Sequence, residues 1–375
     1  MDFLIEAIKE VTWQQMVMWV IGFILIYLAI KKDMEPALLL PMGFGAILVN
    51  IPFSNVLNEV VGGAVQSNGI IQWLFEVGIE ASEALPILLF IGIGAMIDFE
   101  PLIVNPKLMF LGAFAQLGIF LTIILASLLG YNISDAASIG IIGAADGPTS
   151  ILVAMKLGSQ YLGPIMVVAY SYMALVPIIQ PAVIKCITTK KERLIRMDYN
   201  TKKVSKTVKI LFPIVITLVA GLIAPKSLAL VGFLMFGNLL NECGVLGSLA
   251  DTAKTTLANL ITLLLGITVA FQMQAEKFLT VDTLTIIALG LFAFVFDTVG
   301  GVMCAKVMNL FCKKKINPMI GAAGISAFPM SARVVHKMGL KEDNSNYLLM
   351  HAVGANVSGQ IASAVVGGLI IGLVL

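Results

Sequence analysis

Long apolar runs fill almost the whole sequence and constrain its fold more than any other feature. One series lies at about 12–30, 36–51, 84–98, 108–130, 136–157 and 161–187, and a second lies at about 208–224, 227–241, 255–271, 283–311, 316–335 and 346–374. Hydrophobic residues make up 59% of the chain and charged residues 12%, with a mean hydropathy of +0.97. Helices satisfy their own backbone hydrogen bonds in lipid. The sequence therefore predicts an all-α polytopic membrane protein.

A basic stretch separates the two series. Residues 185–209 contain nine Lys or Arg side chains and two acids, which by the positive-inside rule places the stretch in the cytoplasm. The loop 52–83 has four Glu and no Lys or Arg, so we expect it outside. The predicted organisation is an N-terminal membrane repeat (1–187), a basic cytoplasmic linker (188–207) and a C-terminal membrane repeat (208–375). The linker is either a plain solvated connection or a surface for anionic lipid or a soluble partner.

Asp146 is the unusual residue of the first series, in the stretch GAADGPTS. An ionised carboxylate at a bilayer centre costs roughly 2.5–3.5 kcal/mol on insertion scales, and Gly147 and Pro148 break a helix at the same place. Freed carbonyl groups in a broken membrane helix can coordinate an ion. We predict a broken helix that lines a cation site. The alternative is a buried aspartate satisfied by neighbouring hydroxyl groups.

The charge pattern independently requires this break. If 136–157 and 161–187 both crossed fully, the basic linker would lie outside. A second broken run at 316–335 keeps Arg333 on the cytoplasmic side, and its sequence MIGAAGISAFPMSAR resembles IIGAADGPTSILVAM of the first half. We therefore predict two inverted-topology repeats, each with about five spanning helices and one broken or re-entrant segment.

Polar residues of the second half complete a candidate site. Oxygen donors occur in NPMIGAAGISAFPMSAR and in GANVSGQIASA: Asn317, Ser326, Ser331, Asn356, Ser358, Gln360 and Ser363. Such donors suit a hard cation such as sodium and not a transition metal. For Ser358 and Ser363 the alternative is helix packing through small residues.

Other chemistry finds little support in the sequence. The nucleotide-binding and hydrolase motifs GxxxxGK, GxGxxG after a strand, HExxH and GxSxG are absent. The four cysteines lack the spacing of a zinc site or a disulfide framework. A net charge of +2 does not indicate nucleic acid as a partner.

The segments GAADGPTSILVAMKLG, NPMIGAAGISAFPMSARV and HAVGANVSGQIASAVVGG resemble the β subunit of sodium-translocating biotin-dependent decarboxylases, over nearly the whole chain. The family includes oxaloacetate, methylmalonyl-CoA and glutaconyl-CoA decarboxylases. The resemblance implies a subunit of the bacterial inner membrane that decarboxylates carboxybiotin, consumes a proton and exports sodium. It also implies a carboxyltransferase α subunit, a biotin carrier protein, small membrane subunits and a homo-oligomer within the complex, surrounded by membrane lipid.

The resemblance also assigns residues. It implies that Asp146 is essential and that Asn317, Gly321, Ser326 and Arg333 form a second essential region. A family tyrosine matches Tyr172, and Tyr170 lies close by. We expect sodium ligands among Asp146, Asn317, Gly321, Ser326, Asn356 and Ser358, and carboxybiotin at Arg333, whose planar guanidinium suits a carboxylate. The alternative function is an elevator-type sodium symporter for a small organic anion, which needs no biotinylated partner.

Overall fold

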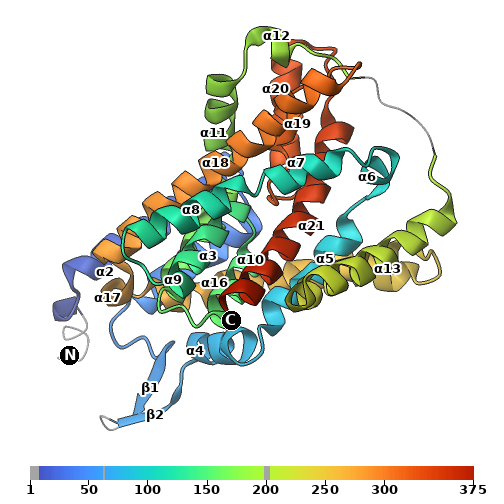
Figure 1. The fold of residues 1–375 in the computed structure, drawn as a ribbon. Helices are drawn as coiled ribbons and strands as arrows, with labels where there is room; N and C mark the ends of the chain where they lie inside the picture. Colours follow the sequence, from blue (N-terminus) through green and yellow to red (C-terminus); the bar gives the residue numbers. More distant parts are fainter. Residues whose placement is uncertain (1–7, 62–63, 198–202) are drawn as a thin grey trace.

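A computed structural model describes residues 8–61, 64–197 and 203–375, and these are largely helical (Figure 1). Asp198 and Lys202 of the predicted linker lie outside the described residues. The main helices of the first half are α2 (Trp13–Lys32), α3 (Pro36–Val49), α4 (Ile70–Phe75), α5 (Ala84–Met96), α6 (Glu100–Val104), α7 (Leu108–Phe114), α8 (Leu117–Leu128), α9 (Ile133–Gly140), α10 (Gly147–Lys156) and α11 (Leu162–Ile187). Those of the linker and second half are α12 (Lys190–Arg193), α13 (Lys206–Ile223), α14 (Leu228–Glu242), α15 (Gly247–Thr252), α16 (Ala258–Val269), α17 (Ala275–Phe278), α18 (Val281–Phe311), α19 (Met319–Ala322), α20 (Met330–Glu342) and α21 (Leu349–Val374).

The apolar runs predicted from the sequence coincide with these helices. Among the described residues, 7 helices are long and apolar enough to cross a membrane, or 8 if the pair formed by 70–80 and 84–96, bent by 68°, is one span. Two expected spans are short, because α3 has 14 residues and α14 has 15. An α-helix rises about 1.5 Å per residue, so helices of this length fall short of a hydrocarbon core of about 30 Å.

The loop 52–83 contains structure that the all-α prediction omits. Strands β1 (Asn58–Val61) and β2 (Ala64–Asn68) form an antiparallel hairpin. Together with α4 it projects from the lower edge of the molecule in Figure 1. The helical prediction thus holds for the apolar runs, whereas the polar loop between them folds differently.

Both helix breaks predicted from Gly and Pro are present. In the first broken segment, α9 continues into a 3-10 turn, η2 (Ile141–Ala144), and the chain reverses at Ala145, which has a positive φ of 52°. Pro148 then lies in the first turn of α10, where its missing N–H and fixed φ are tolerated. In the second broken segment, α19 ends at Ala322 and α20 begins at Met330.

The two ends of each broken segment lie close together. At the first, Asp135 accepts hydrogen bonds from Ser159 Oγ (2.7 Å) and Gln160 N (3.2 Å). At the second, Asn317 and Asn346 both donate through Nδ2 to the carbonyl oxygen of Arg193, at 2.9 and 3.0 Å. Each broken segment therefore leaves the helix bundle at the same end at which it enters.

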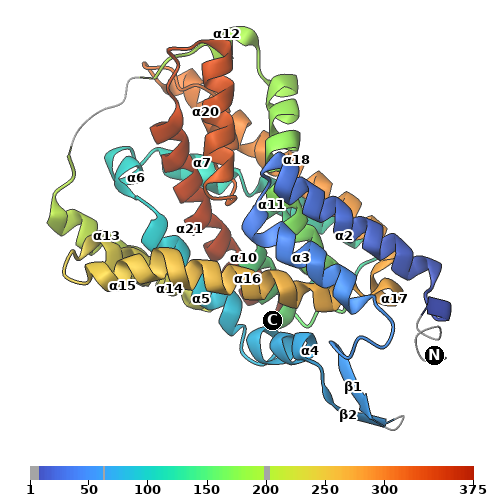
Figure 2. The same cartoon turned by 180° about the vertical axis from the view of Figure 1, so that it is seen from behind.

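Corresponding helices of the two halves make corresponding contacts. Helix α3 packs against α16, and α14 packs in the same way against α5. Helix α11 packs against α18, and α21 packs against α7. Within each half, α10 packs against α11 and α20 packs against α21. Figure 2 shows α21 and α11 near the centre, with α2 and α3 on one flank and α13, α14 and α16 below. We call the end formed by α12, α20 and the last turns of α18 the basic end, and the end carrying the β1–β2 hairpin the opposite end (Figure 1).

Candidate ion-binding site

The two broken segments meet in the interior. The backbone N–H of Ser326, in the second break, donates to the carbonyl oxygen of Ala144 in the first, at 3.1 Å. Helix α21 contacts the same point. Ser326 Oγ donates to the Gly359 carbonyl oxygen (2.9 Å), and Gln360 Nε2 donates to the Ser326 carbonyl oxygen. Backbone groups of the two breaks thus meet directly, beside α21.

Asp146 lies at this meeting point and is buried, with 3% of its surface exposed. Thr149 Oγ1 donates to its carboxylate Oδ2 at 2.6 Å, and Ser363 Oγ of α21 lies 3.4 Å from the same oxygen. No Lys or Arg in the described part of the chain forms an ion pair with Asp146. The alternative, an aspartate whose hydrogen bonds are made by neighbouring hydroxyl groups, is therefore partly present. Two hydroxyl groups do not offset the cost of burying an ionised carboxylate inside the membrane.

Tyr170 and Tyr172 point in different directions, because residues two apart on a helix lie on nearly opposite faces. The ring of Tyr170 packs against Gly147, where an added Cβ would lie 2.2 Å from the ring carbon Cε1. Its hydroxyl is buried and has no hydrogen-bond partner in the described residues. Tyr172 instead donates to the Ile287 carbonyl oxygen of α18 and stacks on Phe294. Of the two predicted tyrosines, Tyr170 is the one beside Asp146.

Helix α21 contributes amide oxygens to the interior. Asn356 Nδ2 donates to the Ile325 carbonyl oxygen (2.7 Å) and lies 3.3 Å from Ser331 Oγ, so it clamps the second break. The side-chain oxygens of Asn356 and Gln360 are buried and lack a hydrogen-bond partner in the described residues. Residues at i, i+4 and i+7 share one helix face, which sets Asn356, Gln360 and Ser363 in a row. We call Asp146, Thr149, Tyr170, Ser326, Asn356, Gln360 and Ser363 the central polar site.

Three predicted sodium ligands have their contacts elsewhere. Asn317 uses both ends of its amide, donating to Arg193 and Ile195 carbonyl oxygens and accepting from Met319 N. A Cβ at Gly321 would lie 2.1 Å from the Gly301 carbonyl oxygen, so this glycine permits close packing of α19 on α18.

Ser358, the third, lies against α7. Its hydroxyl is 2.7 Å from the Ala355 carbonyl oxygen and 2.9 Å from that of Leu108. This contact matches the packing alternative that small residues in membrane helices suggest.

Arg333 lies in the first turn of α20, three residues after the helix begins at Met330 beside the second break, and it is exposed. Its charge reaches Glu35, in the turn between α2 and α3. Burial raises the pKa of Glu35, and the positive charge of Arg333 opposes that rise. The sequence predicted Arg333 at the cytoplasmic end of its broken segment, but the end of α20 that meets the linker is Glu342, which pairs with Arg193, and Arg333 lies nearer the break.

The sequence reasoning missed Asp297, which is fully buried in the middle of α18. Its Oδ1 accepts from the backbone N–H of Ile119 (3.2 Å) at the start of α8, and its Oδ2 lies where a Cβ on Gly143 would come within 2.4 Å. The signal that identified Asp146, a lone acid inside an apolar run, applies equally to Asp297. Gln180, whose Nε2 donates to the Ala322 carbonyl oxygen (2.7 Å), was also missed.

These features define a multi-pass helical membrane protein whose interior holds buried carboxylates, Asp146 and Asp297, and several neutral oxygens. The family model described as the Na+-transporting oxaloacetate decarboxylase beta subunit matches residues 14–374. The chain therefore belongs to this family and is the membrane-embedded, sodium-translocating type of decarboxylase subunit, in the inner membrane. The family prediction made from the three motif segments is confirmed.

Individual relatives cover nearly the full chain. The sequence is 48% identical to the methylmalonyl-CoA decarboxylase subunit beta of Propionigenium modestum, over 95% of this chain and 94% of that protein. It is 47% identical to the glutaconyl-CoA decarboxylase subunit beta of Acidaminococcus fermentans, over 97% and 94%. It is 41% identical to a probable oxaloacetate decarboxylase beta chain of Vibrio cholerae, over 97% and 96%. These matches do not favour the alternative of a sodium/organic-anion symporter.

Proposed function

We propose that this chain decarboxylates carboxybiotin presented by a partner subunit and couples that reaction to the export of sodium. The observation that carries the proposal is the buried Asp146 carboxylate at the point where both broken segments meet. Moving one charge against 100 mV costs about 2.3 kcal/mol, so two sodium ions cost about 5 kcal/mol. An exergonic decarboxylation can supply a load of that size.

The central polar site is the proposed sodium site. Sodium, as a hard cation, prefers oxygen ligands, and we assign these to Asp146, Ser326 and Asn356. Gln360, Tyr170 and Ser363 join them because their oxygens lie in the same buried site or lack a partner in the described residues. We assign Asn317, Gly321 and Ser358 to holding the second segment and α21 in place, because their polar or backbone groups already have protein contacts.

Arg333 is the proposed contact for the carboxylate of carboxybiotin. It is exposed on the first turn of α20, its charge is permanent, and its fork of N–H donors fits a carboxylate. When bound, carboxybiotin releases CO2 and takes up one proton at its ring nitrogen. Tyr170, whose hydroxyl faces the interior without a partner in the described residues, is our candidate for holding a proton near Asp146. We place Tyr172 behind it as a support for α11 on α18.

We further infer that residues 1–187 and 208–375 are inverted repeats joined by the linker 188–207, with the basic end in the cytoplasm. The corresponding helix contacts and the two broken segments entering from different ends support this arrangement. Labelling tests it: cysteines replacing Ser67 and Lys190 should react with an impermeant maleimide from different sides of the membrane. Labelling of both from one side would overturn the topology.

The proposed partners are a carboxyltransferase α subunit, a biotin carrier protein and small membrane subunits, within a homo-oligomeric complex. The test is purification through a tag on this chain, followed by avidin capture, decarboxylation assays with oxaloacetate, methylmalonyl-CoA and glutaconyl-CoA, and sodium uptake into inverted vesicles. We expect avidin-retained partners and decarboxylation of one acid that requires sodium. Sodium-independent decarboxylation, or sodium transport without any biotinylated partner, would refute the proposal.

A further inference from the structure

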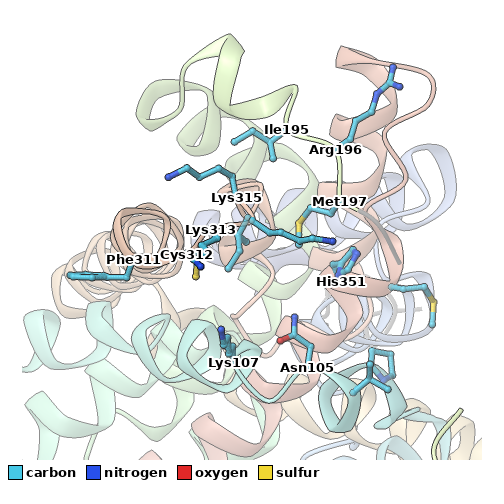
Figure 3. Close-up of a pocket in the computed structure, with 15 residues that line it drawn as sticks. Asn105, Lys107, Ile195, Arg196, Met197, Phe311, Cys312, Lys313, Lys315 and His351 are labelled. Carbon is cyan, nitrogen blue, oxygen red and sulfur yellow. The ribbon is translucent and has the colours of Figure 1, made fainter. Parts of the chain in front are cut away.

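A cavity of about 890 Å³ opens at the basic end (Figure 3). Its walls come from α6 and the turn after it (101–107), the linker residues 195–197, the end of α18 with the following residues (311–316) and the first turn of α21 (350–351). Its volume lies within the range of roughly 300–1,000 Å³ that is usual for small-molecule sites. The central polar site contributes no residue to this lining.

The cavity is strongly cationic. Lys107, Arg196, Lys313, Lys314 and Lys315 line it, and the lining contains no Asp or Glu. Clefts lined by one sign of charge concentrate ligands of the opposite sign. The cavity therefore repels sodium and attracts an anion, which excludes it as the sodium entrance.

Two of these cations are available to a ligand. Arg196 pairs with Asp343 at 2.6 Å, and Lys315 Nζ donates to the Asn309 carbonyl oxygen at 2.6 Å. Lys107 and Lys313 form no ion pair within the part of the chain that the structure describes. Figure 3 shows the Lys313 side chain extending across the cavity, with Lys107 and Asn105 on the facing wall.

The rest of the lining is apolar. Val104, Ile195, Met197, Phe311, Ile316 and Met350 surround the lysines. Apolar walls with a few placed polar groups are the usual construction of a site for a small organic molecule. A ligand that combines a carboxylate with a compact ring matches both parts of the lining, whereas inorganic phosphate would leave the apolar walls uncovered.

The cavity is joined to both elements that build the central polar site. The backbone N–H of Asn317, which follows the lining residue Ile316, donates to Met197 Sδ at 3.3 Å. His351 in the lining lies five residues before Asn356 on α21, a rise of about 7.5 Å along the helix. A molecule bound in the cavity thus touches the start of the second broken segment and the helix that carries Asn356 and Gln360.

We propose that this cavity receives the carboxylated biotin ring on the arm of the partner subunit, with the carboxylate between Lys107 and Lys313. This proposal rests on the proposed function. Arg333 does not line the cavity. The cavity is therefore a first binding site for the carboxylated ring, separate from the Arg333 position on α20.

Lys107→Gln and Lys313→Gln in the whole complex test the site. Each should raise the apparent KM for added carboxylated carrier domain about tenfold, the size of one charge-assisted hydrogen bond, with kcat at saturating carrier nearly unchanged. Lys190→Gln, exposed at the same end but outside the lining, is the matched control and should leave KM within about twofold. Equal, small effects at all three positions would overturn the cavity as the binding site.

Cys312 gives a readout independent of turnover, because it lines the cavity whereas Cys186 is exposed on α11. The probe is the acid that the complex is found to decarboxylate, because it carboxylates the biotin of the partner subunit. Added in sodium-free buffer, it should slow N-ethylmaleimide labelling of Cys312 but not of Cys186, as followed by peptide mass spectrometry. Unchanged labelling in a complex that still carries out sodium-dependent decarboxylation would refute the cavity and spare the proposed function. Protection by vesicles of anionic lipid, and none by the acid substrate, would assign the cavity to lipid headgroups.

Discussion

The first and second broken segments share one backbone arrangement but differ in the polar groups that they carry. The first holds a carboxylate, Asp146, at its break, whereas the second break, residues 323–329, offers only a hydroxyl and carbonyl groups. Their ends differ as well. Asp135 closes the first through neutral donors, and the ion pairs Arg193–Glu342 (2.7 Å) and Arg196–Asp343 (2.6 Å) fasten the linker to the second. The comparison teaches that the first segment carries the buried negative charge and the second carries the connection to the basic end.

The largest expected effect comes from removing the charge of the first break. Asp146→Asn keeps the size of the side chain and its contact with Thr149, so the complex should assemble. Sodium-dependent decarboxylation should fall about 10³-fold, equivalent to about 4 kcal/mol. The matched control is Asp135→Asn, the same exchange at the end of the same segment, which should retain sodium-dependent turnover. If both variants lose activity to the same extent, the break has no special role.

The next effect concerns how tightly each break is packed. A Cβ at Gly321 would lie 2.1 Å from the Gly301 carbonyl oxygen, and one at Gly147 would lie 2.2 Å from Tyr170 Cε1. Overpacking costs typically about 1–3 kcal/mol. Gly321→Ala should lower thermal stability in detergent because a backbone group must move, whereas Gly147→Ala should displace Tyr170 and reduce turnover more than stability.

Gly372→Ala, with no heavy atom within 4 Å of the added Cβ, is the control and should match the wild type in both assays. Wild-type behaviour of Gly321→Ala and Gly147→Ala would show that neither break is closely packed.

The smallest effect is at the ends of the segments. The backbone N–H of Ser345 and then Arg196 lower the pKa of Asp343. A carboxylate whose pKa is lower in the folded than in the unfolded protein stabilises the fold at pH values above its unfolded-state pKa, about 3.9. This stabilisation is lost as the pH falls through the folded-state pKa. Arg196→Gln should therefore flatten the loss of stability below about pH 4, measured by thermal melting. An unchanged pH profile would show that this ion pair does not fasten the linker.

Much of this arrangement could be predicted from the sequence. Apolar length predicted the helices, and the Gly147-Pro148 pair predicted the first break, because both signals are local. Contacts between distant residues could not be predicted. Whether Tyr170 or Tyr172 faces Asp146 depends on how α11 is rotated against α10 and α18. Asn317 was predicted as a sodium ligand because the amino-acid sequence does not reveal that the linker lies against its side-chain amide. Asp297 could have been identified from the sequence as a lone acid in an apolar run, but its hydrogen bond with Ile119 at the start of α8 depends on the fold.

The central claim is that Asp146 of the first broken segment binds sodium while Arg333 of the second serves carboxybiotin. The direct measurement is equilibrium sodium binding, by calorimetry or ²²Na, to purified complexes carrying Asp146→Asn or Arg333→Lys. Arg333→Lys should bind sodium within about threefold of the wild type, a change under about 1 kcal/mol, and lose carboxybiotin turnover. Asp146→Asn should show no saturable binding. Wild-type sodium affinity in Asp146→Asn, or loss of sodium binding in Arg333→Lys with intact carboxybiotin turnover, would contradict the account.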